Sequence, residues 1–170
     1  MDSKNVFAEY LRKDASLKPE EIELICHYFQ EEFLSRETPL LMAGSKYKKI
    51  VFVVEGVLRI FIVDNNGEEV VKNFLEPMSF FAEIESLEKN QNSHINVCAV
   101  TDCILLTLSK QDANKLINQF PRWEYLIQAG AMHAMNDMIY VRYGPCSRPY
   151  RSLFPGTFQG GSRCCNRFHA

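Results

Sequence analysis

The sequence contains no run of apolar residues close to the ~18 that a membrane-spanning helix requires. Its first residues, Met1 to Asn5, lack the basic, apolar and small-residue order of a secretory signal. Six cysteines are present, but none of them form the Cys-x-x-Cys pair that is typical of metal sites. We therefore expect reduced thiols in a cytoplasmic protein that has no membrane partner and no bound metal.

Acidic residues are missing from the C-terminal end of the chain. All 21 lie at or before Asp137, whereas the arginines at 142, 148, 151, 163 and 167 follow it without a single acid. Residues 144–170 also contain scattered Gly and Pro and repeat neither the helical nor the strand period. They are predicted to form an irregular basic tail that buries little apolar surface.

Residues 1–36 are predicted to be helical. Pro19 suits the first position of a helix, and the acids at positions 20, 21 and 23 favour the positive end of the helix dipole. Apolar side chains then recur with the spacing of one helix face, at Ile22, Ile25, Cys26, Phe29 and Phe33.

From residue 38 to residue 108 the pattern changes to that of a β-roll. Runs of β-branched and aromatic residues predict strands over 50–54, 57–63, 70–75, 94–99 and 104–108. The stretch from Asp64 to Gly67 predicts a tight hairpin, because Asn and Gly tolerate the positive φ that such turns require. Many short strands separated by turns are typical of an antiparallel roll or sandwich.

Helices are predicted again over residues 109–143. Ser109, with Asp112 three residues later, resembles a capping box at the start of the first helix. Pro121 separates this helix from a long second one over 122–143, which Gly144-Pro145 ends. The predicted organisation is one domain over residues 1–143, mainly β with flanking helices, followed by the tail over 144–170.

The order of these elements resembles the cyclic nucleotide-binding domain of Crp/Fnr-type bacterial transcription regulators. The stretches that carry the resemblance are Val54–Arg59, Asn66–Glu69, Phe80–Glu83, Ala99–Cys103 and Leu108-Ser109. The resemblance implies a double-stranded β-helix (jelly roll) followed by a long dimerisation helix. It also implies a sensor and dimerisation module of a transcription regulator, and not an enzyme.

In active members of that family, a Phe-x-Gly-Glu cassette is followed by an Arg and a Ser or Thr. A helix N-terminus and the Arg hold the cyclic phosphate, and the Glu accepts a hydrogen bond from the ribose. The corresponding ligand-binding positions in this chain are Phe81, Ala82, Glu83, Ile84, Ser93 and His94. The Glu is kept, whereas Ala82 replaces the Gly, Ser93 replaces the Arg and His94 replaces the Ser or Thr.

The missing Arg decides what ligand to expect. Losing one charge-assisted hydrogen bond costs about 1.5–3 kcal/mol. The phosphate cassette is therefore predicted to be degenerate and to bind cyclic AMP weakly or not at all. A cyclic nucleotide or another small anion remains the ligand class to consider.

The long helix forms the dimer seam in this family, which implies a homodimer. Leu126, Met135, Met138 and Ile139 would supply the apolar seam here. Relatives place a helix-turn-helix domain after this helix, but the residues after Tyr143 carry no such pattern. DNA binding therefore requires that domain in a full-length product, and we expect the tail to be a truncated or frame-shifted end.

Two alternatives stay open. A cupin-type metalloenzyme shares the roll, but it needs about three histidines and a carboxylate around one metal ion. The histidines of this chain are scattered, at His27, His94, His133 and His169. The second alternative, a ligand-free domain that binds a protein partner, is favoured by Ser93 in the arginine position.

Overall fold

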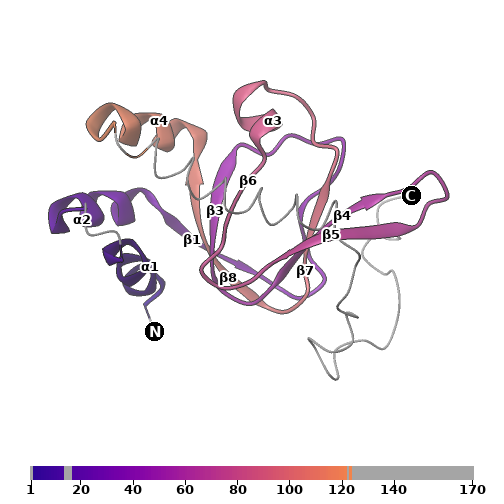
Figure 1. Ribbon diagram of the computed structural model, residues 1–170, viewed down its shortest axis with the longest axis horizontal. Helices are drawn as coiled ribbons and strands as arrows, with labels where there is room; N and C mark the ends of the chain where they lie inside the picture. The colour runs from indigo at the N-terminus through magenta and orange to yellow at the C-terminus, as the bar shows by residue number, and fades with distance from the viewer. Residues whose placement is uncertain (1, 14–16, 122, 124–170) are drawn as a thin grey trace.

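The computed structural model describes residues 2–13, 17–121 and 123 (Figure 1). In the described part, two helices precede an eight-stranded β-structure, a short helix lies between its sixth and seventh strands, and a fourth helix follows it. The elements are α1 Ser3–Arg12, α2 Pro19–Tyr28, β1 Gln30–Leu34, β2 Pro39–Leu41, β3 Lys49–Glu55, β4 Leu58–Val63, β5 Glu69–Leu75, β6 Phe80–Ala82, α3 Ile84–Glu88, β7 Asn96–Ala99, β8 Cys103–Ser109 and α4 Lys110–Gln119.

The strands form two antiparallel four-stranded sheets, in the orders β1-β8-β3-β6 and β2-β7-β4-β5. The chain alternates between the sheets, since β3 lies in the first, β4 and β5 in the second, and β6 in the first again. This arrangement confirms the predicted jelly roll. Among the described residues no helix is both long enough and apolar enough to cross a bilayer.

The helical prediction for residues 1–36 is wrong after Tyr28. Phe29 has an extended backbone, with φ −80° and ψ 136°, and Gln30–Leu34 is strand β1, paired with β8. Ile22, Ile25 and Cys26 do form a buried helical face, but Phe33 lies on the strand and is 64% exposed. The apolar spacing misled the prediction because the residues that pair with β1 lie 69 to 77 positions further along the chain.

Other boundaries shift by one or two residues, and two short strands were not predicted. β2 has only three residues, and so does β6, which lies within the phosphate cassette. The predicted strand over 94–99 begins at Asn96 instead. The predicted start of α4 is confirmed, because the Ser109 hydroxyl accepts a hydrogen bond from the N–H of Asp112.

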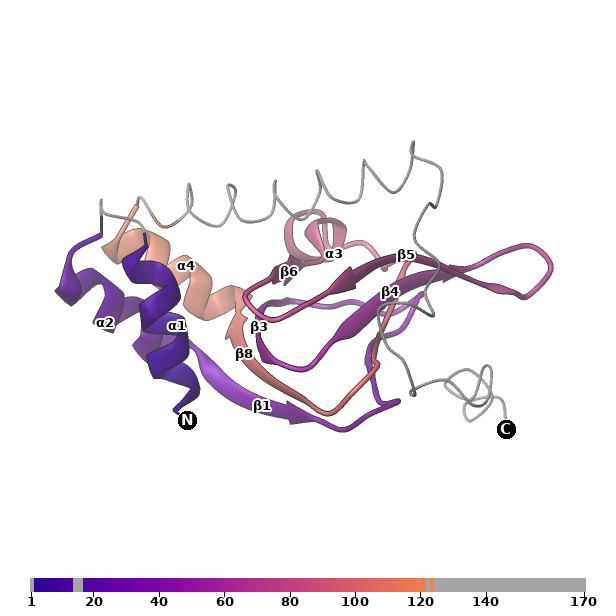
Figure 2. The ribbon, with the colours of Figure 1, turned by 60° about the horizontal axis from the view of Figure 1, so that its bottom comes forward.

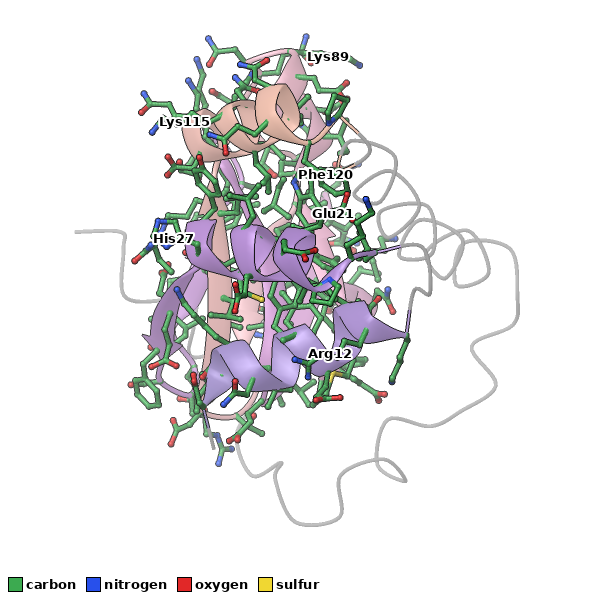
Figure 3. All side chains as sticks on the ribbon, turned by 90° about the vertical axis from the view of Figure 1, so that its left-hand side faces the viewer. Arg12, Glu21, His27, Lys89, Lys115 and Phe120 are labelled. Carbon is green, nitrogen blue, oxygen red and sulfur yellow. The ribbon has the colours of Figure 1, made fainter. Side chains whose placement is uncertain are left out.

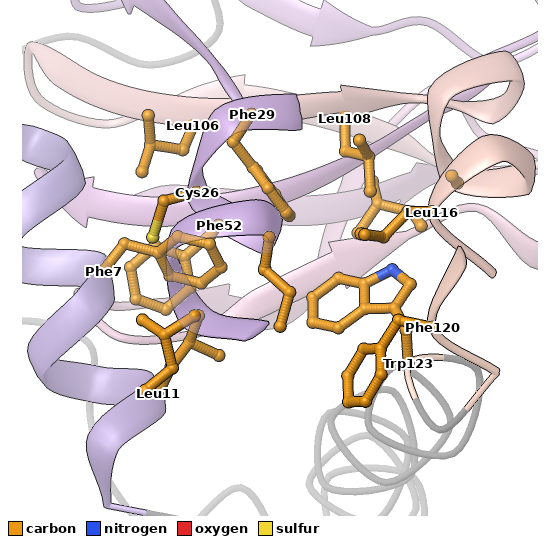
Figure 4. Packing of buried hydrophobic residues seen from close by; sticks show 14 of the residues in the cluster. Phe7, Leu11, Cys26, Phe29, Phe52, Leu106, Leu108, Leu116, Phe120 and Trp123 are labelled. Atoms are coloured by element: carbon orange, nitrogen blue, oxygen red, sulfur yellow. The ribbon is translucent and has the colours of Figure 1, made fainter. Parts of the chain in front are cut away.

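Two apolar clusters lie on either side of the first sheet. One fills the inside of the roll and includes Val51, Val53, Leu58 and Leu105. The other lies between this sheet and helices α1, α2 and α4, which stack on one side of the molecule (Figure 3). In this second cluster the Phe7 ring lies 4.6 Å from that of Phe29 and 4.7 Å from that of Phe52 (Figure 4).

Trp123 closes this second cluster at its far end and is 1% exposed. The long helix predicted over 122–143 otherwise lies outside the described residues. The same holds for the seam residues Leu126, Met135, Met138 and Ile139 and for the tail over 144–170. The domain boundaries and the dimer seam therefore stay predictions.

Gly56 lies in the turn between β3 and β4, where the backbone packs closely against residues 102 and 103. Its φ is +87°, and an added Cβ would lie 2.3 Å from the Asp102 carbonyl oxygen and 2.6 Å from the Cys103 sulfur. We expect Gly56→Ala to lower the free energy of unfolding by about 3 kcal/mol, because backbone strain and overpacking add. Urea denaturation measures this loss.

Gly67 is the matched control, since its φ is +82° and nothing lies within 4 Å of an added Cβ. Gly67→Ala is expected to cost only the backbone strain of about 1 kcal/mol. Equal losses in the two variants would show that the Asp102–Cys103 contact does not restrain the turn.

Candidate functional site

The phosphate-cassette positions span β6, α3 and the loop that leads to β7. Phe81 points into the roll and is 5% exposed, within the interior cluster. Ala82 ends β6, Glu83 is the N-cap residue of α3, and Ile84 is its first helical residue. The structure therefore places these four residues in sequence along one wall of the roll.

Ser93 lies in contact with Glu83 rather than at the surface. It is 1% exposed, and its hydroxyl oxygen lies 3.1 Å from a carboxylate oxygen of Glu83. The same hydroxyl accepts a hydrogen bond from the N–H of Ile95 at 3.1 Å. The two positions that would contact phosphate and ribose in active relatives are thus bonded to each other.

Glu83 uses its carboxylate for this contact and not for helix capping. No side-chain hydrogen bond caps the first turn of α3. A hydroxyl has one proton to donate, and a carboxylate is a stronger acceptor than a neutral carbonyl. The alternative acceptor, the carbonyl oxygen of Ile95, also lies at 3.1 Å, so the Glu83 bond is the stronger of the two choices.

His94 is not brought to the Ser93–Glu83 pair. Its side chain is 86% exposed, and its Nε2 lies 4.0 Å from a carboxylate oxygen of Glu85. Lys89 is also 4.0 Å from Glu85. Of the sequence-predicted ligand positions, the structure therefore brings Glu83 and Ser93 together and leaves His94 in solvent.

The loop between β2 and β3 holds Ser93 in place from the other side. The N–H of Gly44 donates to the carbonyl of Ser93, and the N–H of Ser93 donates to the carbonyl of Ser45, both at 2.8 Å. The N–H of Ala43 donates to the side-chain oxygen of Asn96 at 2.9 Å. These hydrogen bonds fix the backbone around residue 93. No sequence pattern predicted them.

The far end of α3 is tied as well. The hydroxyl of Ser86, which is 0% exposed, donates to the carbonyl of Gln91 at 2.8 Å. The ammonium group of Lys110, at the start of α4, donates to the carbonyl of Leu87. A lysine beside the last carbonyls of a helix also favours the negative end of the helix dipole. Helix α3 is therefore anchored at both ends by hydrogen bonds within the protein.

Tyr47 also lies at the site, although it was not among the predicted site residues. It lies in the β2–β3 loop, packs against the interior cluster, and its ring centre is 6.3 Å from that of Phe81. Its hydroxyl is buried and has no hydrogen-bond partner among the described residues. Burial, with a smaller contribution from the charge of Glu32, raises the pKa of Tyr47. The alternation of Lys46, Tyr47 and Lys48 was the one available hint of an inward side chain.

Other reactive groups of the described chain do not gather here. No three His, Cys, Asp or Glu side chains in this part of the chain lie close enough to share a metal ion. Cys26, Cys98 and Cys103 are free thiols and are all buried. Burial raises the pKa of the thiols of Cys26 and Cys103, which keeps them protonated and unreactive.

Comparison with known proteins adds to this geometry. The family model for the cyclic nucleotide-binding domain matches residues 31–120. The Cyclic AMP receptor protein of Thermus thermophilus is 30% identical over 105 residues, which are 62% of this chain and 48% of that protein. The cAMP-activated global transcriptional regulator CRP of Salmonella typhimurium is 27% identical over 96 residues, 56% of this chain and 44% of that protein. The chain spans about half the length of these curated relatives.

Solved structures show the same fold. The Thermus thermophilus Catabolite Activator Protein superposes with a TM-score of 0.64 and 27% identity, covering 71% of this chain and 56% of that chain. A cyclic nucleotide-binding domain from Methylobacillus flagellatus gives a TM-score of 0.70 over 86% of this chain and 85% of that chain. At 16% identity, the second match shows the fold alone.

The Ser93 hydroxyl is expected to stabilise the loop. Ser93→Ala leaves the N–H of Ile95 and the carboxylate of Glu83 without this partner, which should lower the free energy of unfolding by about 1–3 kcal/mol. Ser45→Ala is the matched control in the same region, because within the described part of the chain its exposed hydroxyl bonds only the nearby Met42 carbonyl. It should change the free energy of unfolding by less than about 0.5 kcal/mol. Equal effects in urea denaturation would contradict a role for the Ser93 bond.

Tyr47→Phe is expected to leave stability unchanged or raise it by up to about 1 kcal/mol, since it removes a buried hydroxyl that has no partner. The raised pKa keeps Tyr47 protonated in the folded state, whereas the unfolded chain releases this proton near pH ~10. Stability of the unsubstituted protein should therefore fall as pH rises above ~10, and Tyr47→Phe should lose less. Thermal melts across this pH range measure the difference, and identical profiles would contradict the burial of the hydroxyl.

Proposed function

The chain belongs to the family of cyclic nucleotide-binding domains, and from this premise we propose that it is the sensor and dimerisation module of a Crp/Fnr-like regulator whose phosphate cassette binds cyclic AMP weakly or not at all. The family match and the similarity to CRP-type regulators support the first half of this proposal. The geometry around Ser93 supports the second half.

One observation carries the proposal: the hydroxyl of Ser93 is bonded to Glu83 in a buried position. A ligand with a ribose and a cyclic phosphate would have to share the carboxylate of Glu83 with this hydroxyl. It would then find a neutral hydroxyl where an arginine would offer two charge-assisted hydrogen bonds. Losing about 1.5–3 kcal/mol of binding free energy corresponds to a loss of roughly 10- to 150-fold in affinity.

The local charge also disfavours an anion. Glu83, Glu85 and Glu88 lie on or beside α3, and Lys89, the one cation in that segment, is near Glu85. Lys110 reaches the last turn of α3, but it bonds the Leu87 carbonyl. A phosphate placed at the start of α3 would therefore face two carboxylates at once, and opposite charge is what a phosphate site requires.

The partners follow from the relatives and stay proposals. The similar proteins of known name are regulators of transcription, so we propose that this module acts within a dimeric regulator. The predicted long helix over 122–143 would carry the seam, through Leu126, Met135, Met138 and Ile139. DNA would be bound only by a helix-turn-helix domain in the full-length product.

A domain that has lost its ligand and serves to bind a protein partner is the second candidate. It is favoured by the hydrogen bonds of Ser93, Ser86 and Lys110, which hold α3 through contacts within the protein. The two candidates differ in whether a cyclic nucleotide stabilises the protein. The similarity to named regulators gives no support to a cupin-type enzyme.

Calorimetric titration with cyclic AMP tests the proposal. The unsubstituted protein should bind weakly or give no heat, whereas Ala82→Gly with Ser93→Arg should tighten binding by at least about tenfold. A thermal shift gives a second readout, because a ligand at a hundredfold excess over Kd stabilises by ~2.7 kcal/mol.

Adding Glu83→Gln to the double variant is the control, and it should remove the gained affinity because the ribose acceptor loses its charge. Circular dichroism melts establish that each variant is folded before it is titrated. Tight binding of cyclic AMP by the unsubstituted protein would contradict the degenerate cassette while leaving the family assignment intact.

A further inference from the structure

The turn between β4 and β5 has the sequence Asp64-Asn65-Asn66-Gly67, and its hairpin projects beyond the rest of the roll (Figure 2). Asn66 is the only asparagine of the sequence that is followed by glycine. Both residues are exposed, and nothing lies within 4 Å of a Cβ added at Gly67. The side-chain amide of Asn66 and the backbone nitrogen of Gly67 are therefore accessible to water and unhindered by a side chain on the following residue.

An asparagine followed by glycine undergoes a ring closure that needs only water. The backbone nitrogen of the glycine attacks the side-chain amide carbon, so that a new C–N bond forms and the bond from this carbon to Nδ2 breaks. The proton of the attacking nitrogen leaves with the amide group as ammonia. Water then opens the cyclic imide at one of its two carbonyl carbons, which gives aspartate or isoaspartate. Glycine favours the attack because it has no Cβ and a wide choice of backbone angles.

Asp64 restrains the nitrogen that this reaction needs. The N–H of Gly67 donates to the carbonyl of Asp64 at 3.0 Å. The Asp64 carboxylate accepts hydrogen bonds from the N–H groups of Asn66, at 2.8 Å, and Glu68, at 2.9 Å. These bonds, that of Glu68 first, lower the pKa of Asp64, so the carboxylate is charged at neutral pH. Its charge opposes the negative charge that develops on the Gly67 nitrogen as this atom loses its proton.

We propose that Asn66 is a modification site of this chain, converted to aspartate or isoaspartate through a cyclic imide, and that the hydrogen bonds of Asp64 set the rate. Ring closure requires the Gly67 nitrogen to turn from the Asp64 carbonyl toward the side chain of Asn66, so the turn must open locally first. A formed turn thus slows the reaction, and an opened turn permits it. The modification needs no ligand and does not depend on the proposed function.

The products change the turn in two ways. Either product adds a negative charge near Asp64 and Glu68, and like charges repel. Isoaspartate also adds one methylene group to the main chain, which lengthens a turn whose ends are joined by the Asp64–Glu68 hydrogen bond and the Val63–Glu69 pair. Glu69 is in turn the partner of Arg59, at 2.6 Å. Modification is therefore expected to loosen the hairpin beside this ion pair.

Asn92 provides an internal control. It is followed by Ser93, which is also a small residue. The N–H of Ser93, however, donates to the carbonyl of Ser45 at 2.8 Å, and Ser93 is 1% exposed. The nitrogen that would attack the Asn92 side chain is thus held in a buried position, and the reaction there should be several-fold slower than at Asn66.

Incubation of the full chain in mildly alkaline buffer, followed by peptide mapping with mass spectrometry, tests the proposal. The peptide that contains Asn66 should gain the mass of an amide-to-acid change, and an isoaspartate-specific methyltransferase should label it. Asp64→Ala should raise the rate at Asn66 several-fold, because it removes the carboxylate that accepts two N–H groups of the turn. Glu68→Ala is the matched control and should change the rate less, since it removes a nearby negative charge and leaves both of these hydrogen bonds in place.

Gly67→Ala gives the second arm. A methyl group beside the attacking nitrogen hinders ring closure, so the rate at Asn66 should fall several-fold. Melting curves establish that each variant is folded before it is incubated. An Asn66 that reacts no faster than Asn92, or equal rates in the Asp64→Ala and Glu68→Ala variants, would overturn the proposal whatever the ligand titrations give.

Discussion

The two central strands of the first sheet, β3 and β8, are buried on both faces, and this constraint fixes the position of most other elements. On β3, Val51 and Val53 point into the roll, whereas Ile50, Phe52 and Val54 point to the helices. Each face therefore packs against a different layer. The second sheet packs against the inner face, and helices α1, α2 and α4 pack against the outer face. The same requirement explains why β3 reads as an unbroken apolar run instead of an alternating one.

The phosphate cassette contacts both the cluster inside the roll and the cluster under the helices. Phe80 packs with the helical cluster, 5.0 Å from the Phe52 ring, whereas its neighbour Phe81 lies inside the roll. Leu87 of α3 also belongs to the helical cluster. Strand β6 therefore packs on both faces of the sheet, and α3, which follows it directly, packs on the helical face through Leu87.

The sequence predicted elements whose signals are local and missed those that depend on distant partners. The hairpin at Asn66-Gly67 and the start of α4 at Ser109 follow from residues within one turn, and both are correct. Strand β1 was predicted as helix because only its pairing with β8 makes it a strand. The same limit applies at the site. A family pattern located Glu83 and Ser93, but their mutual hydrogen bond and the buried Tyr47 depend on loops that are distant in sequence.

Ser93 does not simply replace an arginine, because it makes structural hydrogen bonds of its own. The backbone of residue 93 is bonded on both sides to the β2–β3 loop, and its side chain points inward at 1% exposure. A longer, charged side chain at this position must displace the Glu83 contact and remain hydrated or paired, because an unpaired buried charge is costly. Position 93 is thus coupled both to the β2–β3 loop and to the carboxylate of Glu83. The cassette residues Glu83 and Ser93 are therefore positioned by hydrogen bonds to each other and to the neighbouring loop.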